Sequence, residues 1–148
     1  MKKSVQRRVY QCSLYLLAIY FIYEGLQNIF DNDNRAKKLN LKIYNTESYV
    51  YNNISQNIKF YDFLTAFTNI FLFLYGFTML VSGCATAFFD DKETRDQFLI
   101  VLIALQVVEA LIIHNPFIET YEMRTRDFVW FSKTIVLGGC LLSAMMLK

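Results

Sequence analysis

Apolar positions gather into four long stretches of the chain, and polar positions are confined mainly to the segments between them. Residues 63–89 contain no Asp, Glu, Lys or Arg. A helix of that length rises about 1.5 Å per residue and crosses a hydrocarbon layer about 30 Å thick. The stretches 9–30, 97–118 and 128–147 fit the same length and carry only one or two ionisable residues each. The pattern therefore predicts four membrane-spanning helices.

The connections between these stretches predict how the helices are arranged. Two connections are short, so consecutive helices should run in opposite directions, as in an up-down-up-down bundle. The connection over residues 31–62 is long and too apolar for a flexible linker. Its apolar residues at roughly helical spacing are Leu41, Tyr44, Tyr51, Ile54 and Ile58. This weak period fits a segment lying along the membrane surface or against a partner, and it fits an irregular, partly ordered loop over the bundle equally well.

Composition supports a membrane protein. The chain has 148 residues, of which 55% are hydrophobic and 17% are aromatic, and these values lie outside the usual range of a soluble domain. Any single stretch could be a buried helix of a soluble bundle, but four in succession leave too little polar surface to cover such a bundle. We therefore predict an all-α fold, an integral membrane four-helix bundle that forms a single domain over residues 1–148.

Charge at the N-terminal end predicts the orientation of the bundle. Lys2, Lys3, Arg7 and Arg8 precede the first span without forming the basic stripe of a nucleic-acid-binding protein. Lys and Arg are equally numerous on the two sides of the predicted bundle, and the cluster beside the first span usually dominates. Both termini are therefore expected inside, in the cytosol or the mitochondrial matrix. The same four residues are candidates for binding the head group of an anionic phospholipid such as cardiolipin.

Polar residues within the predicted spans share one depth. Glu24, Asn69, Glu109 and Lys133 all fall about 8–14 Å from the outer boundary when each residue adds about 1.5 Å, and Gln106 lies one turn from Glu109 on the same helix face. A lone carboxylate facing lipid costs several kcal/mol. We therefore expect these side chains to face one another as an intramembrane polar layer, with His114 and Asn115 nearer the outer mouth.

The charges of this layer do not balance, because two acids face one base. Either one glutamate is protonated, or a partner protein or a lipid supplies the missing positive charge. The layer either holds the four helices together or forms a quinone or proton site. Small residues are expected to let helices approach closely, within the chain or against another subunit. Gly83 and Ala87, and Gly139 and Ser143, repeat at four-residue spacing, and Gly25 directly follows the acid Glu24.

Signatures of independent catalysis are missing from the sequence. One histidine cannot supply two axial ligands to a haem, and the three cysteines lie too far apart in the sequence for a zinc or iron–sulfur motif. Neither a phosphate-binding loop nor a dinucleotide fingerprint is present. We therefore expect a non-catalytic protein with no cofactor and no metal.

Each predicted span contains one longer motif, and these motifs are "IYFIYEGLQNIFDN", "FLYGFTMLVSG", "LQVVEALIIHNPF" and "FVWFSKTIVLGGCLL". Together they resemble the DoxX-like family of four-helix membrane proteins, which is related to the Surfeit-locus cargo receptors. The chain departs from the family at Asn28, where family members often carry a basic residue. The family includes a small membrane subunit of a quinol-using respiratory enzyme, so the resemblance implies a place near an electron-transport chain.

These observations favour a non-catalytic accessory subunit of a mitochondrial inner-membrane respiratory complex, packed against other membrane subunits and phospholipid. Two alternatives stay open. One is a cargo receptor or transporter of the secretory pathway, and the other is a quinone-binding subunit of an oxidoreductase. Asn53-Ile54-Ser55 is an N-glycosylation sequon, and a glycan there would exclude the mitochondrion.

Overall fold

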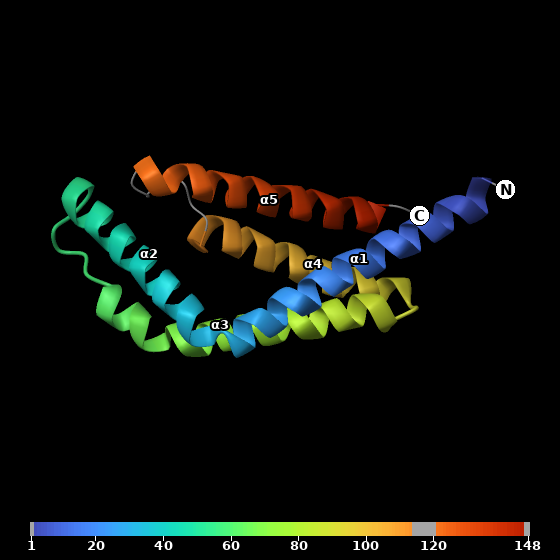
Figure 1. Ribbon diagram of the computed structural model, residues 1–148, viewed down its shortest axis with the longest axis horizontal. Helices are drawn as coiled ribbons and strands as arrows, with labels where there is room; N and C mark the ends of the chain where they lie inside the picture. The colour runs from blue at the N-terminus through green and yellow to red at the C-terminus, as the bar shows by residue number, and fades with distance from the viewer. Residues whose placement is uncertain (1, 114–120, 147–148) are drawn as a thin grey trace.

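The computed structural model describes residues 2–113 and 121–146, with side chains placed at residues 5, 7–111 and 128–146. All regular structure in this part of the chain is helical (Figure 1). The helices are α1 (Lys2–Phe30), α2 (Asn32–Asn53), α3 (Tyr61–Phe88), α4 (Lys92–Val108), the π-helical turn η1 (Glu109–Ile113) and α5 (Tyr121–Met146).

Three of the described helices are long and apolar enough to cross a membrane, so the chain is a membrane protein. The apolar segments are Arg7–Phe30 in α1, Tyr61–Phe88 in α3 and Phe128–Met146 in α5. The predicted span 97–118 falls on α4, which has 17 residues and a charged first turn, on η1, and on residues outside the described part. The expected set of four equivalent spans is therefore not confirmed.

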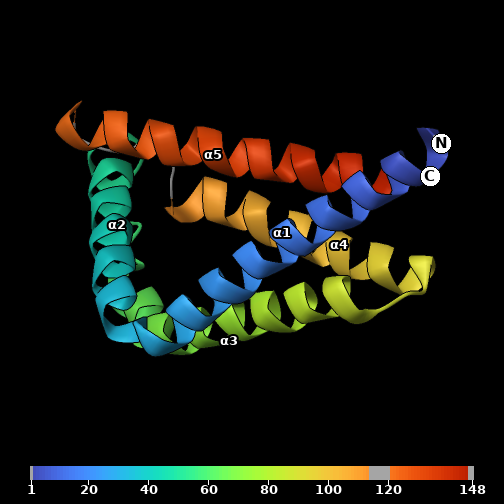
Figure 2. The ribbon, with the colours of Figure 1, turned by 45° about the vertical axis from the view of Figure 1, so that its right-hand side comes forward.

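The long helices alternate in direction along the chain. In Figure 1, α1 and α4 run one way and α3 and α5 run the other. The start of α1 lies beside the end of α5, where the Tyr10 hydroxyl donates a hydrogen bond to the carbonyl oxygen of Ala144 (3.1 Å). The guanidinium of Arg95, at the start of α4, lies over the Tyr10 ring, 5.6 Å from its centroid. From this end, α1 and α5 diverge toward the other end of the molecule (Figure 2).

The segment between α1 and α3 is mostly a helix and not a partly ordered loop. It contains no Gly or Pro, the residues that most strongly oppose a helix interior. Ala36 and Leu39 of α2 are buried against Leu72 of α3, and the buried Thr68 of α3 donates a hydrogen bond to Asn40 Oδ1 of α2 (2.7 Å). α2 stands across the direction of α3 and α5 at one end of the molecule (Figure 2).

Glycines allow the main chains of α1 and α3 to come very close to each other. A Cβ atom on Gly25 would lie 2.7 Å from the carbonyl oxygen of Gly76, and one on Gly76 would lie 2.8 Å from the carbonyl oxygen of Gly25. Further along the interface, a Cβ atom on Gly83 would lie 3.1 Å from Ile22 Cγ1 and 3.2 Å from the carbonyl oxygen of Ala18. Because α1 and α3 meet at backbone distance, they form the most extensive helix pair of the fold.

The other predicted small-residue contacts lie elsewhere. Ala87 is half-buried near the end of α3. On α5, a Cβ atom on Gly139 would meet nothing within 4 Å, and Ser143 is exposed and donates a hydrogen bond to the carbonyl oxygen of Gly139 (2.9 Å). Within the described residues, no helix packs against this face of α5. Gly139 and Ser143 therefore form no close helix contact within the chain, and a contact with another subunit stays a prediction.

Candidate functional site: a polar layer beside α2

The acid inside the first span, Glu24, pairs with a cation from α2. Arg35 Nη1 lies 3.1 Å from Glu24 Oε2. The chain bends at Asp31, between α1 and α2, and this bend brings the first turn of α2 across the end of α1. The Arg35 and Glu24 side chains are 28% and 18% exposed, so the ion pair is partly sheltered and its attraction is less screened than on an open surface.

Asn28, one turn after Glu24 in α1, forms hydrogen bonds with both residues of this ion pair. Its side chain is buried, its Oδ1 atom accepts a second hydrogen bond from Arg35 Nη1 (2.9 Å), and its Nδ2 atom donates to the carbonyl oxygen of Glu24 (3.0 Å). Nδ2 also lies 3.8 Å from Met79 Sδ in α3. Both polar ends of the Asn28 amide are therefore satisfied, as a buried amide requires. The basic group near the end of the first span comes from α2 and not from position 28.

The second acid, Glu109, accepts hydrogen bonds from two neutral side chains. Glu109 Oε2 accepts hydrogen bonds from the Tyr75 hydroxyl of α3 (2.9 Å) and from Gln106 Nε2 of α4 (3.0 Å). Tyr75 and Gln106 are both buried. Glu109 is also the first residue of η1, where α-helical hydrogen bonding gives way to π-helical hydrogen bonding. Such π-turns occur frequently at functional sites.

The base predicted in the layer, Lys133 of α5, packs on aromatic rings. Its Nζ atom lies 4.9 Å from the ring centroid of Tyr20 in α1 and 4.4 Å from that of Trp130 in α5. An ammonium over an aromatic face is stabilised by the ring quadrupole, most strongly where water is scarce. Lys133 therefore connects α5 to α1.

Two tyrosines join the parts of the layer. Tyr20 and Tyr75 each interact electrostatically with both Glu24 and Glu109. Among the described side chains, Arg35 therefore adds a second cation to the layer beside Lys133. This positive charge next to Glu24 comes from within the chain.

The other predicted site residues lie away from this layer. The Asn69 side chain is exposed, and its carbonyl oxygen accepts a hydrogen bond from Asn32 Nδ2 (3.0 Å). Arg7 and Arg8 are exposed near the start of α1. Lys2 and Lys3 belong to the same helix, but their side chains lie outside the described part, as do His114 and Asn115.

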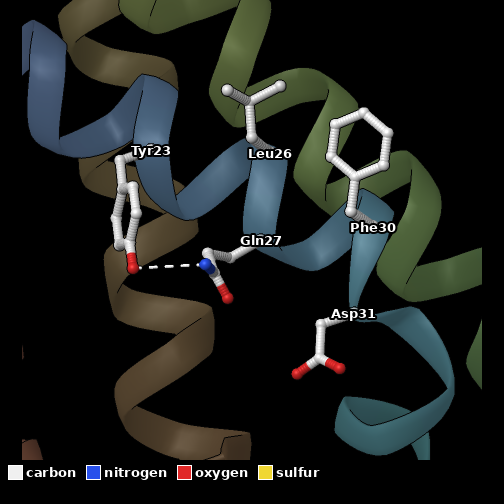
Figure 3. A pocket seen from close by; sticks show the side chains of 5 residues that line it. All are labelled: Tyr23, Leu26, Gln27, Phe30 and Asp31. Carbon is white, nitrogen blue, oxygen red and sulfur yellow. Dashed lines mark hydrogen bonds between the residues drawn. The ribbon is translucent and has the colours of Figure 1, made fainter.

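A shallow open groove of about 280 Å³ lies beside the layer, along the last turns of α1 (Figure 3). Tyr23, Leu26, Gln27, Phe30 and Asp31 line it, and Gln27 Nε2 donates a hydrogen bond to the Tyr23 hydroxyl (3.1 Å). None of the charged groups of the layer lines this groove. The groove is therefore a feature of the outer surface of α1 and not an entrance to the layer.

The layer offers charge pairing and hydrogen bonding, with Arg35 as the residue that sequence reasoning missed. Among the described residues, no group of three or more His, Cys, Asp or Glu side chains could hold a metal ion. Comparisons with protein-family models, with curated proteins and with solved structures found no match to this chain. The resemblance to the DoxX-like family therefore stays a prediction from sequence motifs.

Proposed function

We propose that this protein is a non-catalytic accessory subunit of a respiratory complex in the mitochondrial inner membrane, where it packs against other membrane subunits and phospholipid. We further infer that α4 and η1 together cross the membrane, which makes the protein an up-down-up-down four-helix unit. The polar layer then holds the four helices together at one depth.

The open side of α5 is the observation that supports a subunit role most directly. α5 packs mainly on α4 and η1 and makes only a few contacts with α1. In the most apolar part of this helix, only 17% of the residues are buried. Gly139 and Ser143 on the open side would allow a helix of a neighbouring subunit to approach at backbone distance, which is how small residues stabilise helix pairs in lipid.

The proposed mitochondrial setting rests on the basic residues near the N-terminus, and the glycosylation sequon at Asn53 provides a test of it. Arg7 and Arg8 are exposed at the end where α1 begins and α5 ends, in position to contact anionic head groups of a matrix-facing leaflet. Asn53 is exposed at the end of α2, so a glycosyltransferase could reach it in the secretory pathway. We expect the native protein to carry no glycan at Asn53, and a glycan there would favour the receptor or transporter alternative instead.

The test is to purify the tagged chain gently from its native membranes and identify what migrates with it on a native gel. We expect respiratory subunits at high mass. Gly139→Leu should release the chain from that assembly, because the added side chain fills the open side of α5 without a clash inside the protein. Ala66→Leu is the matched control, since Ala66 is a small exposed residue of α3.

Migration of the wild-type chain alone would contradict the proposal. Retention of Gly139→Leu in the assembly would remove α5 as the contact surface while leaving the subunit role in place.

A further inference from the structure

One buried polar atom near the centre of the layer has no partner. Gln106 is 1% exposed, and its Nε2 atom donates to Glu109 Oε2 (3.0 Å). Its Oε1 atom accepts no hydrogen bond from any described residue. The amide orientation is determined by the carboxylate, because only the NH₂ end of Gln106 can donate to it. The Oε1 atom is therefore left as an acceptor that needs a donor.

Two buried hydroxyl groups on the helices that pack against α4 are already committed elsewhere. The Tyr75 hydroxyl is committed to Glu109 Oε2 and to the carbonyl oxygen of Leu105 (3.3 Å). On α5, the buried Thr134 donates its hydroxyl proton to the carbonyl oxygen of Trp130 (2.9 Å). The donor must therefore come from outside the described residues. With α4 and η1 crossing the membrane as proposed above, a molecule that partitions into lipid can supply it.

The backbone beside Gln106 and the helix arrangement above it favour access. The π-turn η1 begins three residues after Gln106, and such turns interrupt the regular hydrogen-bond ladder of a helix. Tyr20 and Lys133 are only partly buried and belong to α1 and α5, which diverge toward this end (Figure 2).

We propose that Gln106 Oε1 accepts a hydrogen bond from the hydroxyl group of a membrane-soluble amphiphile that enters between α1 and α5. A hydroxyl group fits because it donates to the amide oxygen and can also accept from the Lys133 ammonium, which has three donors. A quinol and a lipid glycerol group share this chemistry. This ligand site rests on the proposed crossing of the membrane by α4 and η1. It does not depend on the proposed role as a subunit, since it uses the interior of the chain and not the open face of α5.

Trp130 makes the site directly observable, because it is the only tryptophan in the chain and lies against Lys133. The full-length protein in mild detergent would be titrated with decylubiquinol and, separately, with monooleoylglycerol, while tryptophan emission is recorded. We expect a saturable change in emission with one of the two. Gln106→Leu should weaken that binding about five- to tenfold, the loss expected for one neutral hydrogen bond.

Gln97→Leu is the matched control, since it makes the same change at an exposed position of the same helix and should leave the titration unchanged. If Gln106→Leu does not fold, Gln106→Met keeps the length of the side chain without the acceptor and takes its place. Saturation by decylubiquinol alone would identify a quinol, and saturation by monooleoylglycerol alone would identify a lipid hydroxyl. A titration unaffected by loss of the Gln106 acceptor, or no saturation by either probe, would overturn the proposal.

Discussion

Glu24 is the residue whose position in an apolar span most needs a physical reason. A carboxylate facing lipid would cost several kcal/mol. Arg35 provides the counter-charge eleven residues later, and Asn28 accepts from the same Arg35 nitrogen. The three side chains join the end of α1 to the start of α2. The ion pair therefore fixes the bend between the two helices in addition to neutralising the acid.

Arg35→Met should destabilise the protein by about 1–3 kcal/mol, because it leaves a partly buried carboxylate and the buried Asn28 Oδ1 atom without their donor. Glu24→Gln should recover part of this loss in the double variant, since the unpaired charge is then removed. The measurement is the free energy of unfolding by denaturant in mild detergent, for both single variants and the double variant.

Lys38→Met, at an exposed position of α2, is the control and should change the free energy of unfolding by less than about 0.5 kcal/mol. Strict additivity of Glu24→Gln and Arg35→Met would mean that the two side chains do not stabilise the bend together.

Sequence reasoning found part of the layer at this scale. Counting residues from the predicted span ends placed Glu24, Glu109 and Lys133 at one depth, and the structure connects all three through Tyr20. Arg35 could not be found in the same way, because its position depends on a bend at Asp31 that no Gly or Pro marks. Asn69 has the expected depth, but depth alone does not determine the side of a helix on which a residue lies.

At the scale of helices, the Gly25–Gly76 contact decides how α1 and α3 pack. Gly25→Ala should destabilise the protein by about 1–3 kcal/mol, because its Cβ atom would lie 2.7 Å from a main-chain oxygen that cannot move aside cheaply. The matched control is Gly139→Ala, whose Cβ atom meets nothing and which should stabilise α5 by up to about 1 kcal/mol. Thermal unfolding midpoints of the two variants should move in opposite directions, and equal shifts would contradict the close approach.

The start of α4 carries a pH-dependent cap outside the apolar segments. Asp91 accepts hydrogen bonds from the main-chain N–H (2.8 Å) and the hydroxyl (2.7 Å) of Thr94, and these bonds hold the pKa of the Asp91 carboxyl below its usual range. Because the folded pKa is the lower one, the stabilisation is present above the unfolded pKa of about 4 and is lost as the pH falls through the folded pKa.

Asp91→Ser keeps an N-cap hydroxyl but cannot titrate. The difference in thermal midpoint between wild type and Asp91→Ser should therefore favour the wild type at neutral pH and shrink as the pH falls below about 4. A difference that stays constant from neutral to acidic pH would show that the Asp91 charge does not contribute to the stability of α4.

The helices differ in how well their sequence predicts them. α1, α3 and α5 follow from long, predominantly apolar stretches, whose length and composition indicate helices that cross a membrane. For α2, the sequence pattern does not distinguish a helix from a loop, because Lys, Asn and Tyr are mixed along this segment and weaken the helical period. Its burial depends on Ala36 and Leu39 meeting Leu72, a contact between distant parts of the chain that periodicity does not reveal.

At the scale of the whole molecule, the number of membrane crossings determines whether the two ends of the chain lie on the same side of the membrane. Three helices are long and apolar enough to cross a membrane, and an odd number of crossings would put the two ends of the chain on opposite sides. The alternating directions of α1, α3, α4 and α5, with the start of α1 beside the end of α5 (Figure 1), instead favour four crossings. The charged first turn and short length of α4 explain why composition alone does not identify α4 as a span.

Epitope tags at either end of the chain and in the 54–60 connection after α2 would separate these topologies. In sealed vesicles, we expect both end tags to share one side and the 54–60 tag to lie on the other, because α2 stands at the opposite end of the bundle from the Tyr10–Ala144 contact (Figure 2). Protease digestion before and after permeabilisation measures this, and digestion of every tag after permeabilisation is the control. End tags on opposite sides would mean that α4 does not cross, and Glu109 and Gln106 would then lie outside the hydrocarbon region, where a polar layer needs no special explanation.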